Sequence, residues 1–531
     1  MRLPELNVVI KNWRKVDLKF ALCYPSRYRV GMACLAIHLI YDLLNSIPNV
    51  LCERAFLDVG FFRTIESNRK LLDFDVIGFS LQYEMDYVNF VRMLLASNIP
   101  PYSRDRNDSH PIILVGGAAV TANPEPIAPI ADAILIGEIE PIMNDIVAAL
   151  QYDRREKILE ELSQIRGIYI PIYNNKVDRV WAKSLNDAPH AINQIIPQLP
   201  LSSPYNPIFG RAFLLEITRG CNWGCKFCLE GYNYLPMRQR SIKILKKILN
   251  LGLKSTNVKK VVIIGSAAFN HSNFEDLCEH IVNDLNIKIS IPSIRASFLN
   301  EKLASIIVKG GQRTITFAPE TGNDLLREVI GKRTLSNDEI VQAARIANKC
   351  GIKQVKLYFM IGLPGESISD IESIAILAKK IADQGFTTPK SVRLTINPFI
   401  PKANTPFQWF GIENVKSLRT KIKFLKTLLA RDHRIELRMG RLREYVIQAF
   451  LSTSGRSAAE AIILAAKSGG TLSSWRRVEK LLKISIEEKA STKRDLDDKL
   501  PWNYINSGVS RDYLLRKYME TLRLIEKIGK G

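Results

Sequence analysis

The sequence predicts an α/β protein with two sheet-containing units followed by a helical region. Up to about residue 150, short apolar runs alternate with helix-length amphipathic segments, and the same alternation resumes between 211 and about 400. After Pro406 the strand signals fade and helical periodicity remains. Near-continuous apolar strands separated by crossover helices are typical of parallel sheets that are buried on both faces. Each of the first two units is therefore expected to contain a parallel sheet.

We expect residues 1–150 to form a doubly wound, Rossmann-like sheet. The predicted strands are 18–24, 51–57, 75–80, 112–115 and 133–136, and the predicted helices are 34–44, 87–96 and 141–150. Ligands of such sheets bind beyond the carboxyl ends of the strands. Those ends carry Ser80, Gly116, Gly117, Gly137 and Glu138. Small residues there would let a bulky ligand approach the backbone, although the same glycines could simply make tight turns.

A connector is expected over residues 151–209. It contains a charged helix, a short strand at 167–171, and four prolines at positions 197, 200, 204 and 207. Proline at this density breaks helices and excludes central strands. We therefore place a domain boundary near residue 200.

Residues 210–410 are predicted to form a parallel, partial (βα)6 TIM-like barrel. The predicted strands are 212–217, 260–264, 288–291, 314–317, 354–359 and 391–395, and the helices between them include 242–250, 274–284, 301–309, 337–350 and 368–383. Functional groups of such barrels gather at the C-terminal ends of the strands. The polar and glycine-rich segments of this unit fall at those ends.

A basic helical domain is expected over residues 411–531. Helical periodicity covers 411–430, 441–452, 457–468, 475–490 and 511–527, and the stretch 416–443 is rich in Lys and Arg. The whole chain has 75 Lys and Arg against 53 Asp and Glu, a net charge of +22. This charge fits RNA or another anionic partner, but a basic proteome or a solvated helix face would produce the same signal.

Composition limits the class of protein further. With 531 residues, 46% of them hydrophobic, the chain can bury several cores, and eight cysteines are too few for a disulfide scaffold. No apolar run approaches the roughly 18 residues that cross a bilayer, and the N-terminus lacks a secretory apolar segment. A cytoplasmic protein without a membrane partner is expected.

Three of the eight cysteines form a C-x3-C-x2-C cluster directly after the first barrel strand. They are Cys221, Cys225 and Cys228. Such a cluster indicates either zinc or an iron–sulfur centre. Structural zinc takes four ligands, but the next candidates in sequence are His271 and Cys278. Three thiolates on one loop would leave one iron of a four-iron cluster open to a small molecule, so we favour the iron–sulfur interpretation.

The segment from Ile217 through Thr218, Arg219 and Gly220 to Cys228 resembles the cluster-binding signature of the radical S-adenosylmethionine (radical SAM) superfamily. The resemblance covers about 205–410. It implies a [4Fe–4S] cluster on the three cysteines, with S-adenosylmethionine (SAM) chelated at the fourth iron. It further implies reductive cleavage of SAM to a 5′-deoxyadenosyl radical, with a ferredoxin- or flavodoxin-like electron donor.

The same resemblance assigns SAM contacts to other strand ends, at Gly265, Ser266, Ala267, Arg295, Glu320, Gly362 and Pro364. The segment 265–268 lies where the superfamily often has an acidic residue for the SAM amine. That acid is missing here, so only backbone carbonyls could serve. Arg295 could pair with the SAM carboxylate, and Glu320 resembles the ribose-binding position, although both could be ordinary ion-pair residues. The segment of Gly362 and Pro364 resembles the adenine site.

The N-terminal unit resembles the cobalamin-binding domain that precedes many radical SAM barrels. The resemblance covers about 15–150, through the segments 75–84, 115–117, 123–126 and 132–138, and implies cobalamin contacts at Ser80, Gln82, Gly116, Gly117, Gly137 and Glu138. The Asp-x-His-x-x-Gly motif that supplies a histidine to cobalt is absent. Segments 25–32, 52–54 and 500–510 extend the resemblance to an uncharacterised family of B12-binding radical SAM proteins.

The leading hypothesis is a radical SAM enzyme, cobalamin-dependent, that methylates or otherwise modifies an unactivated carbon. One alternative is radical modification of tRNA or other RNA by a methylthiotransferase-like enzyme. Such enzymes carry a second cluster on three widely spaced cysteines, whereas Cys23, Cys34 and Cys52 are closely spaced and fall in predicted strands and a helix, which favours buried apolar cysteine. A non-catalytic iron–sulfur protein that binds nucleic acid is the other alternative. No catalytic residue is assigned beyond the cluster.

Overall fold

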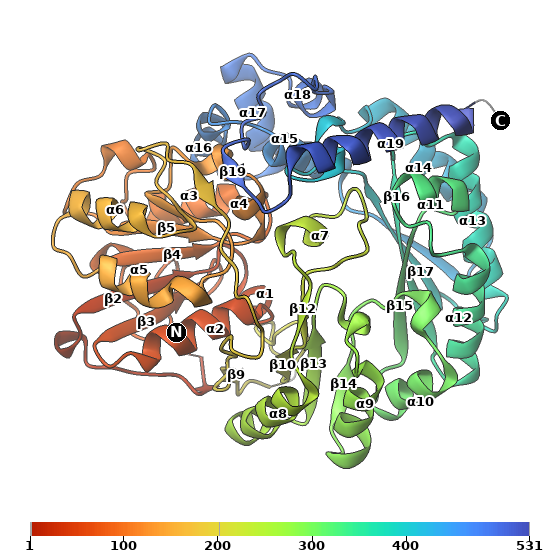
Figure 1. Cartoon of the computed structure of the whole chain (residues 1–531), viewed down its shortest axis with the longest axis horizontal. Coiled ribbons are helices and arrows are strands. Elements are labelled where there is room, and N and C mark those ends of the chain that lie inside the picture. The colour runs from red at the N-terminus through yellow and green to blue at the C-terminus, as the bar shows by residue number, and fades with distance from the viewer. Residues whose placement is uncertain (1–2, 201, 530–531) are drawn as a thin grey trace.

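The computed structural model describes residues 3–200 and 202–529, and its N-terminal unit is built on a six-stranded sheet in the order β3-β2-β4-β5-β6-β7 (Figure 1). These strands are β2 (Leu18–Cys23), β3 (Val50–Ala55), β4 (Val76–Ser80), β5 (Ile112–Gly116), β6 (Ala133–Leu135) and β7 (Ile168–Tyr169). The first five are parallel, and β7 is antiparallel to β6. The order β3-β2-β4-β5-β6 is that of flavodoxin-like doubly wound sheets, in which a ligand crevice opens between the strands β2 and β4.

Helices cover both faces of this sheet. They are α1 (Tyr28–Gly31), α2 (Leu35–Ser46), α3 (Asp86–Ala96), α4 (Ala118–Ala122), α5 (Met143–Ala149) and α6 (Arg155–Gln164). Strands β3 and β4 are buried along their whole length, which explains the apolar sequence of β4. Strand β3 also contains Glu53 and Arg54, and the buried Arg54 is paired with Glu5 and Glu66. All five strands predicted for residues 1–150 are present. The predicted helix at 141–150 is shorter, because a 3-10 turn precedes α5.

Residues 151–209 are not an independent linker. The helix α6 and the strand β7 belong to the N-terminal unit, while β8 (Val177–Asp178) pairs with β19 (Ile505–Asn506) near the C-terminus. The strand β9 (Ile196–Pro197) pairs with β1 (Glu5–Leu6). The prolines do break regular structure, but short backbone pairings fix the segment against both ends of the chain.

The central unit contains the six predicted strands, arranged in two parallel sheets. One has the order β10-β13-β14 and the other the order β15-β16-β17-β18. The strands are β10 (Phe213–Glu216), β13 (Lys260–Ile264), β14 (Lys288–Ser290), β15 (Thr314–Glu320), β16 (Gln354–Ile361), β17 (Val392–Pro398) and β18 (Ile435–Arg438). Between the sheets, the amide of Ile294 donates to the carbonyl of Thr316 at 3.0 Å.

The outer face of this unit is covered by helices. They are α8 (Ile242–Thr256), α9 (Phe274–Glu279), α10 (Glu301–Lys309), α11 (Asp324–Val329), α12 (Asn337–Lys349) and α13 (Ile368–Ala382). Buried and half-buried residues alternate strictly along β15 and β17, because one face of the second sheet packs against the helices and the other does not. The crossover helices predicted for this unit are confirmed.

The C-terminal region differs from the helical prediction in two short strands, β18 and β19. Residues 435–438 form β18, which pairs in parallel with β17. The sequence Ile-Glu-Leu-Arg has the alternation of an edge strand, but four residues inside a basic run are too few to reveal it. The helices of the region are α14 (Val415–Leu429), α15 (Leu442–Ser452), α16 (Ala458–Lys467), α17 (Leu472–Leu482), α18 (Ile486–Ser491) and α19 (Arg511–Gly529). The predicted helix at 475–490 is interrupted at Lys483, which has a left-handed φ of 52°.

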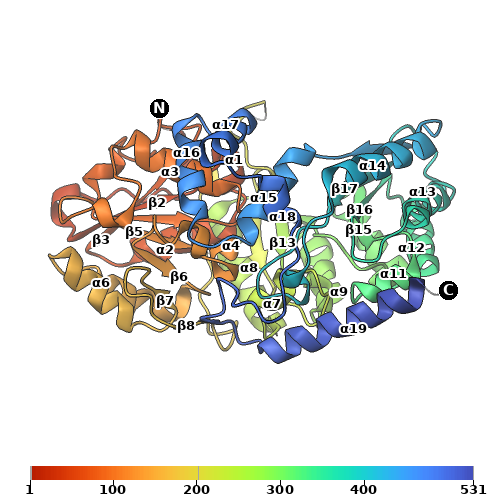
Figure 2. The same ribbon diagram turned by 90° about the horizontal axis from the view of Figure 1, so that it is seen from above.

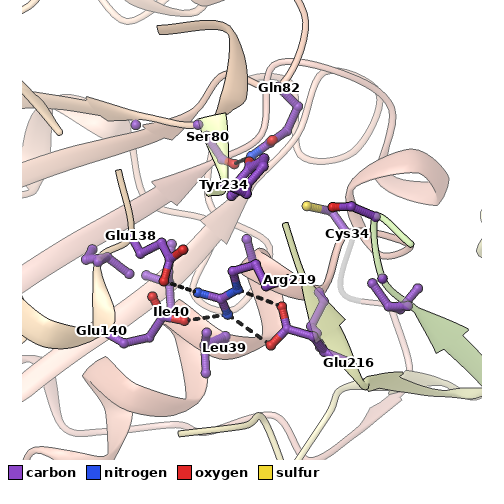
Figure 3. A pocket seen from close by; sticks show the side chains of 18 of the residues that line it. Cys34, Leu39, Ile40, Ser80, Gln82, Glu138, Glu140, Glu216, Arg219 and Tyr234 are labelled. Atoms are coloured by element: carbon purple, nitrogen blue, oxygen red, sulfur yellow. Dashed lines mark hydrogen bonds and ion pairs between the residues drawn. The ribbon is translucent and has the colours of Figure 1, made fainter. Parts of the chain in front are cut away.

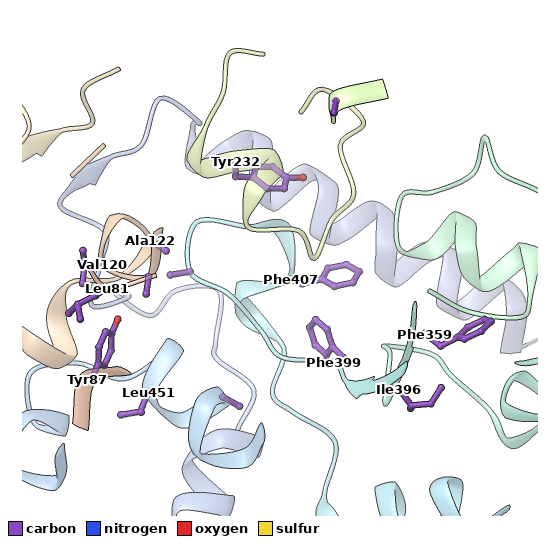
Figure 4. Close-up of a cluster of buried hydrophobic side chains, with 14 of the residues drawn as sticks. Leu81, Tyr87, Val120, Ala122, Tyr232, Phe359, Ile396, Phe399, Phe407 and Leu451 are labelled. Atoms are coloured by element: carbon purple, nitrogen blue, oxygen red, sulfur yellow. The ribbon is translucent and has the colours of Figure 1, made fainter. Parts of the chain in front are cut away.

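The C-terminal helices join the two sheet-containing units. Helix α16 packs against α3 of the N-terminal unit, and α19 runs along the central unit beside α11 (Figures 1 and 2). A single apolar core extends through all three regions, and Figure 4 shows Leu81 and Tyr87 near Leu451 in that core. A second core lies on the opposite face of the N-terminal sheet, around α2 and α5. None of the helices within residues 3–200 and 202–529 is long and apolar enough to cross a membrane.

We expect Trp502 to be essential for the packing of the C-terminal region against the rest of the chain. Its side chain is 1% exposed, and its indole Nε1 donates to Oε1 of Gln408 at 2.7 Å. Replacement by alanine would create a large cavity, so Trp502→Ala should cost roughly 3–5 kcal/mol of unfolding free energy. A lower urea midpoint would report the loss. The control Phe61→Ala removes an aromatic side chain that is 93% exposed and should leave the midpoint unchanged; equal midpoints for both variants would contradict the anchoring role.

Candidate active site between the two sheets

A cavity of about 590 Å³ lies where the carboxyl ends of the two sets of strands face each other (Figure 3). Its walls come from the ends of β2, β4, β5 and β6 on one side and of β10, β13 and β14 on the other. All six residues expected to contact cobalamin line it, namely Ser80, Gln82, Gly116, Gly117, Gly137 and Glu138. From the expected SAM residues, Gly265 and Ser266 also line it. The volume is within the range of cofactor and substrate sites.

The backbone requires glycine at some positions of the cavity wall but not at others. Gly117 has a φ of 121° and Gly137 a φ of 122°, and a Cβ at either position would lie 2.4 Å or less from a backbone oxygen. These two are required by the local turn. At Gly116 the nearest atom to such a Cβ is that of Leu135, at an ordinary 3.6 Å. Packing within the chain does not require glycine at 116, so its small size serves the cavity.

The guanidinium of Arg219 joins the two walls. It contacts Glu138 at 2.7 Å and Glu140 at 2.8 Å on the N-terminal side, and Glu216 at 2.9 Å on the central side (Figure 3). Two further arginines complete the network: Arg238 bonds Glu138 at 2.7 Å, and Arg240 bonds Glu216 at 3.2 Å. The carboxylate of Glu138, expected to face cobalamin, is therefore already held by two guanidiniums.

The cysteine loop follows directly on this network. Strand β11 (Thr218–Arg219) pairs with β12 (Arg238–Gln239), and Gly220 turns the chain into Cys221 with a φ of 83°. A Cβ at Gly220 would lie 2.2 Å from the carbonyl oxygen of Tyr234, so only glycine fits. The amide of Cys228 donates to the carbonyl of Cys225 at 3.1 Å, which closes the loop.

Cations surround the three thiols. Burial raises the pKa of all three, to about 12 for Cys228, while the positive charges of Lys332 and Arg295 act in the opposite direction on Cys221 and Cys225. Within residues 3–200 and 202–529, no three His, Cys, Asp or Glu side chains lie close enough to hold a single metal ion. A set of three thiols on one loop, without a fourth protein ligand and with cations nearby, fits a four-iron cluster with one open iron.

Two further expected SAM residues, Arg295 and Glu320, lie near this loop rather than in the cavity wall. Arg295 stacks on the ring of Trp223 at 4.0 Å and bonds Thr334, and its buried Nε has no partner in the described part of the chain. Glu320 accepts a hydrogen bond from Lys332 at 2.7 Å.

Farther along the same edge, Gly362 has a φ of 74°, and its amide donates to Glu366 at 2.7 Å. Pro364 follows in the same turn, and the buried Ala267 follows the cavity residue Ser266. The assignment of SAM contacts to these residues therefore remains a prediction.

Sequence reasoning missed most charged residues of the cavity. No sequence motif points to the cavity residues Glu140, Glu216, Glu230 and Tyr234, and Arg219 stands out only as part of the cysteine signature. Glu230 could be found as an acidic residue two positions after Cys228, and Glu216 as an acidic residue three positions before Arg219. The pairing of Arg219 with Glu138 could not be found, because Glu138 lies 81 residues earlier in the chain.

The fold and the three-cysteine loop define an iron–sulfur enzyme of the radical SAM class, and comparison with known proteins agrees. The family model "Radical SAM superfamily" matches residues 215–378, and "Radical SAM proteins, N-terminal" matches 36–171. An uncharacterized protein of Methanocaldococcus jannaschii is 32% identical over 79% of this chain and 85% of its own length. The chain belongs to the radical SAM superfamily, whose enzymes use a [4Fe–4S] cluster and SAM.

Other similar proteins carry more specific names. An uncharacterized methyltransferase of Pyrococcus horikoshii is 24% identical over 60% of this chain and 67% of its own. The methyltransferase TsrM from Kitasatospora setae, solved with cobalamin and a [4Fe–4S] cluster, has a TM-score of 0.56 at 12% identity, over 85% of this chain and 99% of its own. The cobalamin-dependent enzyme OxsB gives 0.52 at 14% identity, over 97% and 80%. At these identities the two structures show a shared fold.

Removing Arg219 should destabilise the chain in a pH-dependent way. Burial raises the pKa of Glu216, but the charges of Arg219 and Arg240 outweigh it and lower the pKa to about 2, from 4.5. This carboxylate therefore stabilises the fold above about pH 4.5, and the contribution is lost as the pH falls toward 2. Arg219→Met should lower the thermal midpoint at pH 7 by roughly 5 °C or more, with a flatter acid dependence than the parent chain.

The matched control is Arg104→Met, which removes a guanidinium that is 77% exposed beside Asp105. Its thermal midpoint should equal that of the parent chain at every pH. A normal midpoint and an unchanged acid profile in Arg219→Met would show that the network does not hold the two units together.

Proposed function

We propose that the chain is a cobalamin-dependent radical SAM enzyme that methylates, or otherwise modifies, an unactivated carbon. The observation that carries this proposal is the 590 Å³ cavity bounded by both sets of strand ends. The N-terminal sheet would be the Rossmann-like cobalamin unit, and the two central sheets would form the partial (βα)6 barrel. The proposed domains are the cobalamin unit at 1–150, its connector at 151–209, the barrel at 210–410 and the basic helical domain at 411–531.

The residues present fit these cofactors. Cys221, Cys225 and Cys228 would hold the [4Fe–4S] cluster, and Gly116 and Gly117 would contact cobalamin. When bound, the cluster supplies the electron that splits SAM reductively, and cobalamin would supply a transferable methyl group. The residues proposed for cobalamin line one cavity together with Gly265 and Ser266 from the residues proposed for SAM, and Arg219 links the two units at its wall. The electron would come from a ferredoxin- or flavodoxin-like donor.

The cavity wall is suited to a large, weakly charged ligand. Its lining combines apolar side chains such as Leu22, Leu39 and Val115 with four glutamates and Arg219, and Arg219 is paired with three of those glutamates. Gln82 already donates to Ser80 at 2.9 Å, so these two present one ordered polar edge. Apolar walls with polar groups held in fixed positions are typical of cofactor sites.

The alternative of a methylthiotransferase-like RNA enzyme gains less support. Cys23 and Cys52 are completely buried in β2 and β3, as predicted for apolar cysteines, and the half-buried Cys34 faces the cavity from the start of α2 (Figure 3). Within the basic run, Lys421 is buried between Glu366 and Glu413, and Arg434 pairs with Asp383 and Asp432; Arg438 and Arg443 also form ion pairs. Four of the ten basic residues of the stretch 416–443 are therefore paired with carboxylates within the chain.

The cluster assignment is tested by iron content. Anaerobic reconstitution should give about four irons per chain and, with a reductant, formation of 5′-deoxyadenosine from SAM. Cys225→Ala should reduce bound iron severely and abolish the product, because a thiolate ligand is lost. Cys278→Ala is the control, since Cys278 is a buried residue of helix α9 and not part of the cysteine loop. Equal iron in both variants would refute the assignment.

Cobalamin binding is tested by filling the cavity. Gly116→Val adds bulk where the chain itself leaves room, so the variant should fold normally yet bind at least about tenfold less corrinoid. Corrinoid absorbance after reconstitution and desalting measures the bound amount. Gly455→Val is the control, because a Cβ there also makes an ordinary contact, 3.5 Å from Pro501, outside the cavity. Unchanged corrinoid binding in Gly116→Val would exclude this cavity as the cobalamin site.

A further inference from the structure

A second cavity, of about 690 Å³, lies at the opposite end of the central strands and is lined by basic residues. Lys260 and Lys288, which begin β13 and β14, both line it. The candidate active site lies at the other end of β13, where Ile264 ends the strand. The cations of the second cavity are Arg211, Lys259, Lys260 and Lys288, and within residues 3–200 and 202–529 no Asp or Glu lines it. We call this site the basic cavity.

Two of these lysines are like charges placed side by side on neighbouring strands. Strands β13 and β14 pair in parallel, and Lys260 is the register partner of Lys288. Like charges at such cross-strand positions destabilise a sheet. Burial and the charge of Lys288 both lower the pKa of Lys260. An anion bound near the two ammonium groups would remove this repulsion.

The chain itself does not neutralise the basic cavity. The Nζ of Lys260 donates to the carbonyl of Phe209 at 3.0 Å, and Arg211 donates to the carbonyl of Leu199. Both acceptors are uncharged, and none of the four cations forms an ion pair in the part of the chain that the structure describes. This differs from the stretch 416–443, where Lys421 and Arg434 are paired with carboxylates.

The positive charge continues from the basic cavity along α8, which lies at the lower edge of the molecule in Figure 1. Thr256 and Asn257, at the C-terminal end of this helix, line the cavity. The exposed lysines of the helix are Lys243, Lys246, Lys247 and Lys254. At about 100° per residue they fall within an arc of about 100°, on the side away from the buried residues of the helix. We call these four residues the lysine stripe.

No acidic residue interrupts this region of the sequence. Between Glu230 and Glu275 the chain contains neither Asp nor Glu. Among the described residues, no member of the lysine stripe forms an ion pair. The stripe and the basic cavity therefore form one extended surface of unpaired positive charge, and the 15 residues of α8 alone span about 22 Å. This length exceeds that of a single phosphate group.

The composition of this surface fits a nucleic acid better than an acidic protein. Proteins contact phosphate groups through Lys, Arg and neutral polar side chains such as Asn257 and Gln198, which also line the basic cavity. Protein interfaces are instead depleted in Lys and enriched in aromatic residues, and none of the described residues that line the basic cavity is aromatic. We propose that the basic cavity and the lysine stripe together bind the phosphate backbone of a nucleic acid, independently of its base sequence. This proposal concerns a surface outside the candidate active site and does not depend on the cofactors.

The test measures RNA binding by the full, reconstituted chain. Fluorescence anisotropy with a labelled single-stranded RNA of about twenty nucleotides gives the dissociation constant at several salt concentrations. The double variant Lys260→Gln with Lys288→Gln removes two phosphate contacts. It should weaken binding roughly ten- to thirtyfold at about 0.1 M salt and lower the slope of log affinity against log salt by about one to two. Two RNAs of unrelated sequence should bind the parent chain within about threefold of each other.

Two further double variants complete the comparison. Lys246→Gln with Lys247→Gln tests the lysine stripe and should weaken binding by a similar factor. Lys302→Gln with Lys349→Gln is the matched control, because it removes the same charge from exposed lysines that are each paired with a glutamate. The control should bind RNA within about twofold of the parent chain. The cavity variant should have a thermal midpoint at least equal to that of the parent chain, because it removes two opposed like charges.

Several outcomes would overturn the proposal. They include a parent chain that does not bind RNA at about 0.05 M salt, and equal RNA affinity of the cavity variant and the control. If Lys423→Gln with Lys426→Gln weakened binding more than the cavity variant, the RNA site would lie on α14 instead. Displacement of the RNA by poly-glutamate of equal charge, at an equal or lower concentration, would assign the surface to an acidic protein. Formation of 5′-deoxyadenosine should be the same in the cavity variant and the parent chain, so failure of this proposal would leave the proposed function intact.

Discussion

The guanidinium of Arg219 is the interaction on which the arrangement of the active site depends. It bonds carboxylates from both sheet-containing units, so neither unit can shift without leaving buried charges unpaired. Because Arg219 stands two residues before Cys221, the same contact fixes the start of the cysteine loop. The position of the cluster relative to the N-terminal strand ends is thereby coupled to the contact between the units.

The C-terminal region reinforces that arrangement from the opposite side. Glu84, from the turn after β4, bonds Lys402 at the end of the central unit and Gln448 of α15. Helix α19 reaches the cysteine loop itself, where Glu520 lies 3.5 Å from Lys226. The three regions therefore share ion pairs as well as a core. The sequence pattern changes near residue 200, but side-chain packing continues across that position.

Local sequence patterns predict only part of the candidate site. The spacing of the three cysteines and the glycines after β5 and β6 are local signals, and the structure places the latter in the cavity wall. The ion pairs of Arg219 with Glu138 and Glu140 are not local, because these two partners lie about 80 positions earlier in the chain. They have no counterpart in residue spacing.

The sequence by itself determined the strands and helices of both α/β units, the three-cysteine loop and the radical SAM class, because periodicity and motif spacing are properties of neighbouring residues. Only the tertiary structure decided that the two sets of strand ends face one cavity, that residues 435–438 extend the central sheet as β18, and that Glu138 meets Arg219. These features depend on long-range pairing of backbone groups and charges. A chain gains that pairing only when distant segments are brought together.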